Sequence, residues 1–204
     1  MNIVFEGVDK AGKTSLINEF VRRRFSEGEE WYPVKFSNPV ISKRIQEKWV
    51  HDVRVEPIMQ AETLSEYFGT FKLMKAARLN HLLFDRFFLG EFIYCNLRGY
   101  RYIKSEEGYW IDIFNKLMRE TDTILIYVKA SKDTIIKRMR QDGGDVFTNE
   151  ERVEEILVAY ERILRETNIP CFIIDTDNLA IPQVCDVLEA ILNPFKESNG
   201  GKIL

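Results

Sequence analysis

Short apolar runs alternate along this chain with longer segments of helical period. The runs with a strand pattern are residues 3–6, 34–36, 81–84, 123–128 and 171–174. The segments of helical period are residues 13–24, 89–96, 108–120, 132–140, 149–166 and 183–192, with two or three further helical pieces between 41 and 79 that Pro57 breaks. This alternation is typical of α/β proteins with a largely parallel sheet. We therefore expect one three-layer α/β/α domain over residues 1–195 and a flexible tail over 196–204.

The composition is that of an ordinary globular protein, with 204 residues, 45% hydrophobic and 30% charged positions, and a formal net charge of −3. This balance gives no global attraction to a polyanion, so a general DNA- or RNA-binding role is disfavoured. The three cysteines show no C-x-x-C spacing and predict no disulfide framework. The apolar runs are too short to cross a membrane, and the chain opens on a strand pattern without a basic leader. We expect a reduced, cytoplasmic protein without a membrane partner.

A glycine-containing loop follows the first predicted strand and carries the most specific signal in the chain. Residues Gly7–Thr14 match the pattern G-x-x-x-x-G-K-S/T, with a strand before and a helix after. In such a P-loop the backbone N–H groups and the helix N-terminus hold phosphate oxygens. The residues expected to bind a nucleoside triphosphate are Gly7, Lys10, Ala11, Gly12, Lys13, Thr14 and Ser15. Lys13 would reach the β- and γ-phosphates and Thr14 would hold Mg²⁺; the alternative is a plain glycine turn with a surface lysine.

Charged residues near this loop extend the candidate site. Asp9 lies inside the loop, where it could orient an acceptor, or it is a solvated loop tip. Asp85 and Arg86 follow a predicted strand, so both emerge at the carboxyl edge of a parallel sheet, where α/β proteins place their ligands. The acid could position an acceptor hydroxyl and the arginine could hold a phosphate; the alternative is an ion pair at the strand end.

A polar, glycine-containing stretch over 141–148 follows the helix that carries Arg138 and Arg140. Either these arginines complement the helix dipole, or the stretch is a lid that brings them onto the donor phosphates. Earlier in the chain, Tyr67, Phe68 and Phe71 have helical spacing, which favours core packing over a base-stacking pocket with Lys72 and Lys75.

These motifs resemble the thymidylate kinase-like branch of the P-loop nucleoside and nucleotide kinases. The resemblance rests on Val4–Thr14, on Phe36-Ser37-Asn38-Pro39 and on Asp85-Arg86-Phe87, and residues 85–100 are similar to small phage kinases. It implies the P-loop kinase fold, ATP and Mg²⁺ as cofactors, and a homodimer. It also implies catalytic roles for Asp9, Lys13, Asp85, Arg86 and Arg138, a lid that begins at Arg138 and Arg140, and an adenine contact from Asn178 in the loop after the last strand.

Three hypotheses follow for the function. The first is a kinase that transfers the γ-phosphoryl group of ATP to a deoxynucleoside monophosphate. The second keeps the donor and changes the acceptor to a deoxynucleoside or to a hydroxymethylated base in DNA, with DNA disfavoured by charge. The third is a nucleotide-dependent switch. Switches that bind GTP usually read guanine with the pattern Asn-Lys-x-Asp, and the most similar segment here, Asn115-Lys116-Leu117-Met118, lacks the acid. This absence disfavours the third hypothesis.

Overall fold

The computed structural model describes residues 1–36, 56–97, 101–142, 150–167 and 170–199. Its five strands are β1 (Asn2–Glu6), β2 (Tyr32–Val34), β3 (Leu82–Asp85), β4 (Thr123–Lys129) and β5 (Cys171–Asp175). They form one sheet in the order β2-β3-β1-β4-β5, and every pair is parallel. All five residues of β1 are buried, as expected for the central strand of a sheet covered on both faces.

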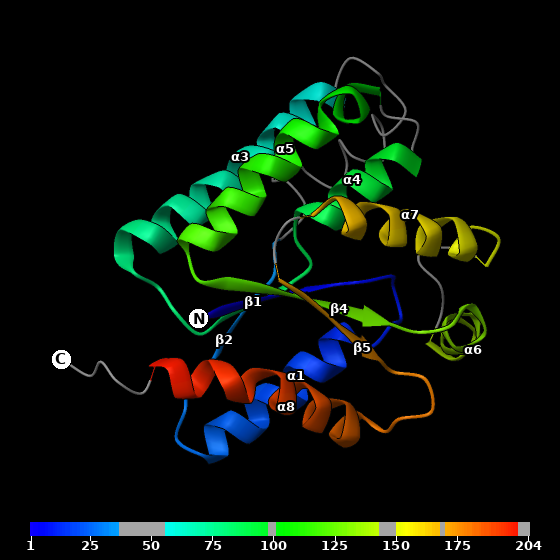
Figure 1. Ribbon diagram of the computed structural model, residues 1–204. Coiled ribbons are helices and arrows are strands. Elements are labelled where there is room, and N and C mark those ends of the chain that lie inside the picture. Colours follow the sequence, from blue (N-terminus) through cyan, green and yellow to red (C-terminus); the bar gives the residue numbers. More distant parts are fainter. Residues whose placement is uncertain (37–55, 98–100, 143–149, 168–169, 200–204) are drawn as a thin grey trace.

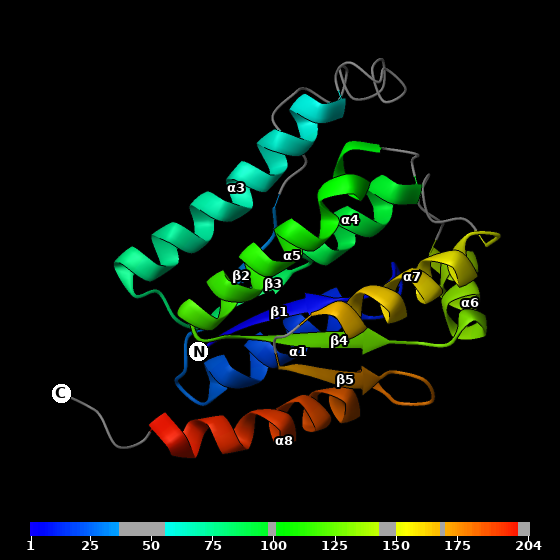
Figure 2. The same ribbon diagram turned by 45° about the horizontal axis from the view of Figure 1, so that its top comes forward.

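Helices cover both faces of this sheet (Figures 1 and 2). One face carries α1 (Lys13–Ser26) and α8 (Ile181–Asn199), which pack together. The other carries α3 (Glu56–Ala77), α4 (Phe88–Leu97), α5 (Arg101–Glu120) and α7 (Val153–Glu166), while α6 (Lys132–Asp142) lies beyond the carboxyl end of β4 (Figure 1). The predicted three-layer α/β/α fold with a central parallel sheet is thus confirmed.

The chain leaves the adjacent strands β1 and β3 in opposite directions. From β1 it passes through α1 to the edge strand β2, and from β3 it passes through α4 and α5 to β4 on the other side of β1. Ligands of open α/β sheets bind beyond the carboxyl ends of the strands at such a switch point. The P-loop follows β1. Asp85 is the last residue of β3, and Arg86 comes directly after it. The P-loop and the Asp85-Arg86 pair therefore both lie at the switch point.

An aromatic cluster supports the end of β3. Phe84 and Phe87 flank the Asp85-Arg86 pair, and both rings pack against Phe71 of α3. Phe87 also contacts Tyr67 of α3 and Phe114 of α5. Such ring pairs contribute about 0.5–1.5 kcal/mol each beyond the burial of their area. The two residues between the rings are therefore held on a rigid base.

Several boundaries differ from the sequence expectation for identifiable reasons. Strand β3 begins at Leu82 because His81 has a positive φ of 62°, which a strand does not accommodate. Strand β2 covers 32–34 instead of 34–36, and it tolerates Pro33 because it is an edge strand. Pro57 lies in the first turn of α3, where its missing N–H removes no helical hydrogen bond.

Helices α5 and α8 extend furthest beyond their expected bounds. Helix α5 begins at Arg101 rather than at 108, and it contains Gly108, whose side of the helix faces open space. Helix α8 continues to Asn199, so residues 196–199, expected as part of the tail, are helical. Residues 200–204 lie outside the described part of the chain.

Candidate functional site

The P-loop wraps tightly between β1 and α1. Gly7 has φ 145°, and a Cβ at this position would lie 2.3 Å from the carbonyl oxygen of Val128 on β4. Gly12 has φ 104° and forms the N-cap of α1. Both glycines of the motif are therefore required by the backbone, and the loop ends on the N-terminus of a 14-residue helix. That helix end attracts anions through its free N–H groups and its dipole.

Lys13, the first residue of α1, folds back over the loop. Its Nζ donates hydrogen bonds to the carbonyl oxygens of Gly7 and Val8, at 2.8 and 2.9 Å. The side chain is almost completely buried. Burial, and after it the positive charge of Arg86, lower the pKa of Lys13 to about 7.

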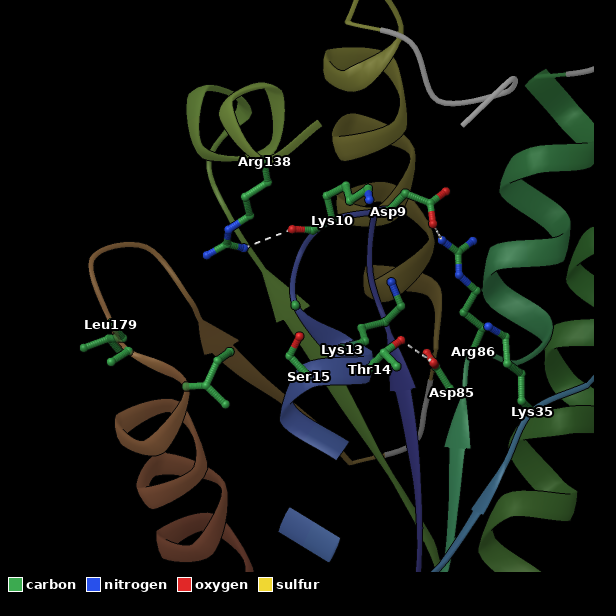
Figure 3. A pocket seen from close by; sticks show the side chains of 13 residues that line it. Asp9, Lys10, Lys13, Thr14, Ser15, Lys35, Asp85, Arg86, Arg138 and Leu179 are labelled. Atoms are coloured by element: carbon green, nitrogen blue, oxygen red, sulfur yellow. Dashed lines mark hydrogen bonds and ion pairs between the residues drawn. The ribbon is translucent and has the colours of Figure 1, made fainter. Parts of the chain in front are cut away.

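Thr14 and Asp85 bring the P-loop helix and the end of β3 into direct contact. The Thr14 hydroxyl donates a 2.6 Å hydrogen bond to Oδ2 of Asp85 (Figure 3). A hydroxyl and a carboxylate at this separation are hard oxygen donors of the kind that bind Mg²⁺ beside nucleotide phosphates. The pair therefore fits the magnesium ion that the motif implies. In the described residues, no three His, Cys, Asp or Glu side chains gather as a further metal centre.

Arg86 crosses from β3 to the P-loop. Its backbone has φ 74°, its N–H donates to the carbonyl of Phe5, and its guanidinium forms an ion pair with Asp9. Tyr94 of α4 donates a 3.1 Å hydrogen bond to the second carboxylate oxygen of Asp9 and places its ring 5.1 Å below the Arg86 guanidinium. Of the two alternatives for Asp9, an acceptor-orienting acid or a solvated loop tip, the second is not seen, because two side chains hold its carboxylate beside the phosphate loop.

Arg138 of α6 approaches the P-loop from the opposite side. Its Nη1 donates to the carbonyl oxygens of Lys10 and Ala11 and to the hydroxyl of Thr176, at 3.0, 3.1 and 3.1 Å. Its Nη2 donates to the carbonyl oxygen of Thr176. Arg138 therefore connects the outer turn of the P-loop to the segment that follows β5.

Glu6, the last residue of β1, is fully buried beneath this arrangement. Its Oε1 accepts hydrogen bonds from the N–H groups of Phe87, Leu89 and Gly90 at 3.0, 3.1 and 3.3 Å, and its Oε2 accepts one from Tyr160 of α7. Burial raises the pKa of the Glu6 carboxyl, and the Arg86 charge and the backbone donors oppose that rise. Glu6 fixes the turn after Arg86 relative to the strand that carries the P-loop.

These groups surround one cavity of about 560 Å³ at the carboxyl edge of the sheet (Figure 3). The residues that line it are Asp9, Lys10, Gly12, Lys13, Thr14, Ser15, Lys35, Asp85, Arg86, Arg138, Leu179, Ala180 and Ile181. Most of the residues singled out from the sequence are in this set, and five of its members are basic against two that are acidic. Lys35, Leu179, Ala180 and Ile181 carried no sequence signal; only their place after β2 and after β5 brings them here.

Other candidates from the sequence lie elsewhere. Arg140 forms a bidentate ion pair with Glu150 and does not line the cavity. Asn178, with φ 58°, directly precedes the lining residues 179–181 without being one of them. Of the expected lid over 141–148, residues 143–148 lie outside the described part of the chain.

The aromatic segment of α3 is mainly structural. Tyr67 and Phe71 are buried, as expected for core residues, whereas Phe68 is 36% exposed. Phe68, Lys72 and Lys75 line a separate groove of about 630 Å³ between α3 and α5. This groove shares no lining residue with the P-loop cavity.

Comparison with known proteins finds solved structures with a similar fold. No family model matches the chain, and no protein of curated function matches its sequence. Among solved structures, a deoxyadenosine kinase from M. mycoides with bound dATP is 24% identical, with a TM-score of 0.63 over 95% of this chain and 100% of that one. The YorR protein from Bacillus subtilis in complex with phosphorylated GDP is 16% identical, with a TM-score of 0.66 over 97% of this chain and 98% of that one.

At these identities the likeness concerns the fold alone, and it extends over nearly the whole length of all three chains. In the described residues, no helix is long and apolar enough to span a membrane. The chain has the three-layer fold of P-loop nucleoside and nucleotide kinases.

Proposed function

We propose that this protein is a kinase that transfers the γ-phosphoryl group of ATP to a deoxynucleoside monophosphate. The observation that carries the proposal is the placement of two different sets of groups on the two sides of one P-loop. Arg138 and residues 179–181 lie on the β5 side, and Asp85, Arg86 and Lys35 lie on the β3 side (Figure 3). A triphosphate in the loop would therefore meet a second substrate across it.

The named ligands of the structural neighbours support this assignment. The deoxyadenosine kinase has been solved with dATP, with dCTP, and with the products dCMP and dCDP. YorR has been solved with phosphorylated GDP. Nucleotides are therefore the ligands of proteins that share this fold over nearly their whole length, and a nucleotide fits a cavity with a basic excess.

The side chains would divide the work of phosphoryl transfer between them. Lys13 would exchange its two carbonyl partners for β- and γ-phosphate oxygens, and the N-terminus of α1 would hold the β-phosphate. Arg86, oriented by Asp9 and Tyr94, would neutralise charge on the transferring group. Arg138 would keep the outer turn of the loop in place. Mg²⁺, held at Thr14 and Asp85, would supply further neutralisation of phosphate charge when bound.

A deoxynucleoside is the second candidate acceptor, because the neighbour of known activity is named a deoxyadenosine kinase. It differs from a monophosphate in one chemical demand. A hydroxyl must lose a proton during attack, whereas a phosphate oxygen is already deprotonated at neutral pH. A nucleotide-dependent switch remains a third candidate and would use the same P-loop without an acceptor.

The test is an incubation of the purified protein with Mg²⁺ and ATP labelled in the γ-position, with a panel of deoxynucleosides, their monophosphates and hydroxymethylated DNA. We expect label in one or more deoxynucleoside diphosphates, and none with Lys13→Met at equal protein concentration. Label in a monophosphate would identify a nucleoside kinase, and label in DNA a kinase of a modified base. Release of free phosphate without any labelled acceptor would contradict the proposal and favour the switch.

A further inference from the structure

Both carboxylates that line the cavity are already bound to partners. Asp9 forms an ion pair with Arg86 and accepts a hydrogen bond from Tyr94. Asp85 accepts the 2.6 Å hydrogen bond from Thr14. Among the described residues that line the cavity, no further acid is present. This side of the P-loop therefore offers no uncommitted carboxylate to take a proton from an attacking hydroxyl.

Lys35 introduces a cation at the same place. It directly follows β2, and the parallel register pairs Val34 of β2 with Phe84 of β3, so Lys35 stands beside Asp85 at the carboxyl edge of the sheet. The Lys35 side chain is exposed to the cavity and has no hydrogen bond or ion pair with any other described residue. Figure 3 shows it on the same side of the P-loop as Asp85 and Arg86, opposite Arg138 and Leu179.

The cavity as a whole has an excess of positive charge, with five basic residues against two acidic ones. Asp9 forms an ion pair with Arg86, Asp85 accepts a hydrogen bond from Thr14, and no described residue forms an ion pair with Lys35. Two basic side chains that face one cavity repel each other unless an anion binds between or beside them. An anionic group on the acceptor would provide this compensation.

We propose that Lys35 binds the phosphate of the acceptor and thereby selects a nucleoside monophosphate over a nucleoside. The inference rests on the proposed function and names a residue that decides the class of acceptor. In the transfer, an acceptor phosphate oxygen forms a bond to the γ-phosphorus while the bond from that phosphorus to the β–γ bridging oxygen breaks. ADP leaves with the electron pair.

This step has a distinctive proton balance. With a dianionic monophosphate as acceptor, the total charge of the two substrates equals the total charge of the two products, ADP and the diphosphate. No proton is therefore released above about pH 7.5, where all phosphate groups are deprotonated. With a nucleoside, the hydroxyl proton is released in each turnover. A cavity with a basic excess, in which both carboxylates already have partners, suits the first reaction and not the second.

The decisive experiment compares wild type with Lys35→Gln, Lys35→Arg and Lys116→Gln in steady-state kinetics with the best monophosphate acceptor. Lys116 is an exposed lysine in the separate groove between α3 and α5 and serves as the matched control. We expect Lys35→Gln to raise the KM for the monophosphate about tenfold, which corresponds to ~1.4 kcal/mol, without changing the KM for ATP. Lys35→Arg should restore most of the loss, and Lys116→Gln should behave as wild type.

Proton release is followed in the same reactions with a pH indicator in weak buffer. If wild type phosphorylates no monophosphate at all, the proposed function itself fails. If wild type phosphorylates a monophosphate but Lys35→Gln keeps the wild-type KM, or raises the KM for ATP equally, the function stands and the role of Lys35 is refuted. Stoichiometric proton release with a nucleoside as the preferred acceptor would also overturn the inference.

Discussion

Glu6→Ala is expected to destabilise the protein far more than Glu6→Gln does. Alanine leaves four buried donors without their acceptor, namely the N–H groups of residues 87, 89 and 90 and the hydroxyl of Tyr160. An unsatisfied buried polar group costs about 1–3 kcal/mol, and a water molecule in the vacated space recovers part of the sum. We expect a net loss of about 3–5 kcal/mol, a large share of the roughly 5–15 kcal/mol that stabilises a typical domain.

Glutamine keeps most of these contacts. Its carbonyl oxygen can face the three N–H groups, and its amide can donate to the Tyr160 hydroxyl. Because burial raises the pKa of the Glu6 carboxyl, a neutral amide at this place also avoids the desolvation of a charge. We therefore expect Glu6→Gln to lie within about 1 kcal/mol of wild type, and Tyr160→Phe to lose about 1 kcal/mol.

Urea unfolding followed by circular dichroism measures the free energy of unfolding of the three variants. Turnover is measured at a temperature at which all of them are folded, and Glu6→Ala should also lose kcat because the turn that carries Arg86 is no longer fixed. Equal stability of Glu6→Ala and Glu6→Gln would refute the assignment of Glu6 as the acceptor of these four hydrogen bonds.

Three further changes probe the P-loop. Gly7→Ala should lower the free energy of unfolding by about 3 kcal/mol, because its Cβ would lie 2.3 Å from the Val128 carbonyl oxygen. Gly28→Ala has open space around it and should lower the free energy of unfolding by only about 1 kcal/mol, through backbone strain alone. Similar losses for the two variants in urea titrations would contradict the close approach at Gly7. The pKa of Lys13 is lowered to about 7, so above this pH the free protein must take up a proton on Lys13 to bind a nucleotide. The Kd for ATP should therefore rise up to tenfold per pH unit between about pH 7.5 and 9. A constant Kd in calorimetric titrations over this range would exclude this linkage. Arg138→Lys cannot make the same set of contacts to Lys10, Ala11 and Thr176 and should weaken ATP binding about tenfold, while an unchanged Kd would show that these contacts do not shape the nucleotide site.

The local parts of the site could be predicted from the sequence. The P-loop is a continuous motif between a strand and a helix, and its glycines have the conformations that the motif requires. The position of Asp85 and Arg86 also followed, because a parallel strand delivers its last residues to a known edge of the sheet. In both cases the information lies within a few consecutive residues.

The partners of these residues could not be predicted in the same way. Tyr160 meets Glu6 from a position 154 residues along the chain, and Thr176 meets Arg138 across 38 residues. Lys35 enters the cavity only because β2 lies beside β3, an arrangement that depends on strand order rather than on any local pattern. The sequence offers Arg138 a place in a lid or a role as a complement to the helix dipole, but no local pattern predicts that its guanidinium donates hydrogen bonds to carbonyl groups of the P-loop and of Thr176.

We expect a nucleoside triphosphate and a nucleoside monophosphate to bind on opposite sides of the P-loop with their phosphates in line. A bisubstrate analogue, adenosine joined through five phosphates to the 5′-oxygen of the preferred deoxynucleoside, tests it most directly. In calorimetric titrations with Mg²⁺ we expect wild type to bind this analogue at least about 100-fold more tightly than ADP, because both halves bind as one ligand. An analogue that binds no more tightly than ADP would contradict the account.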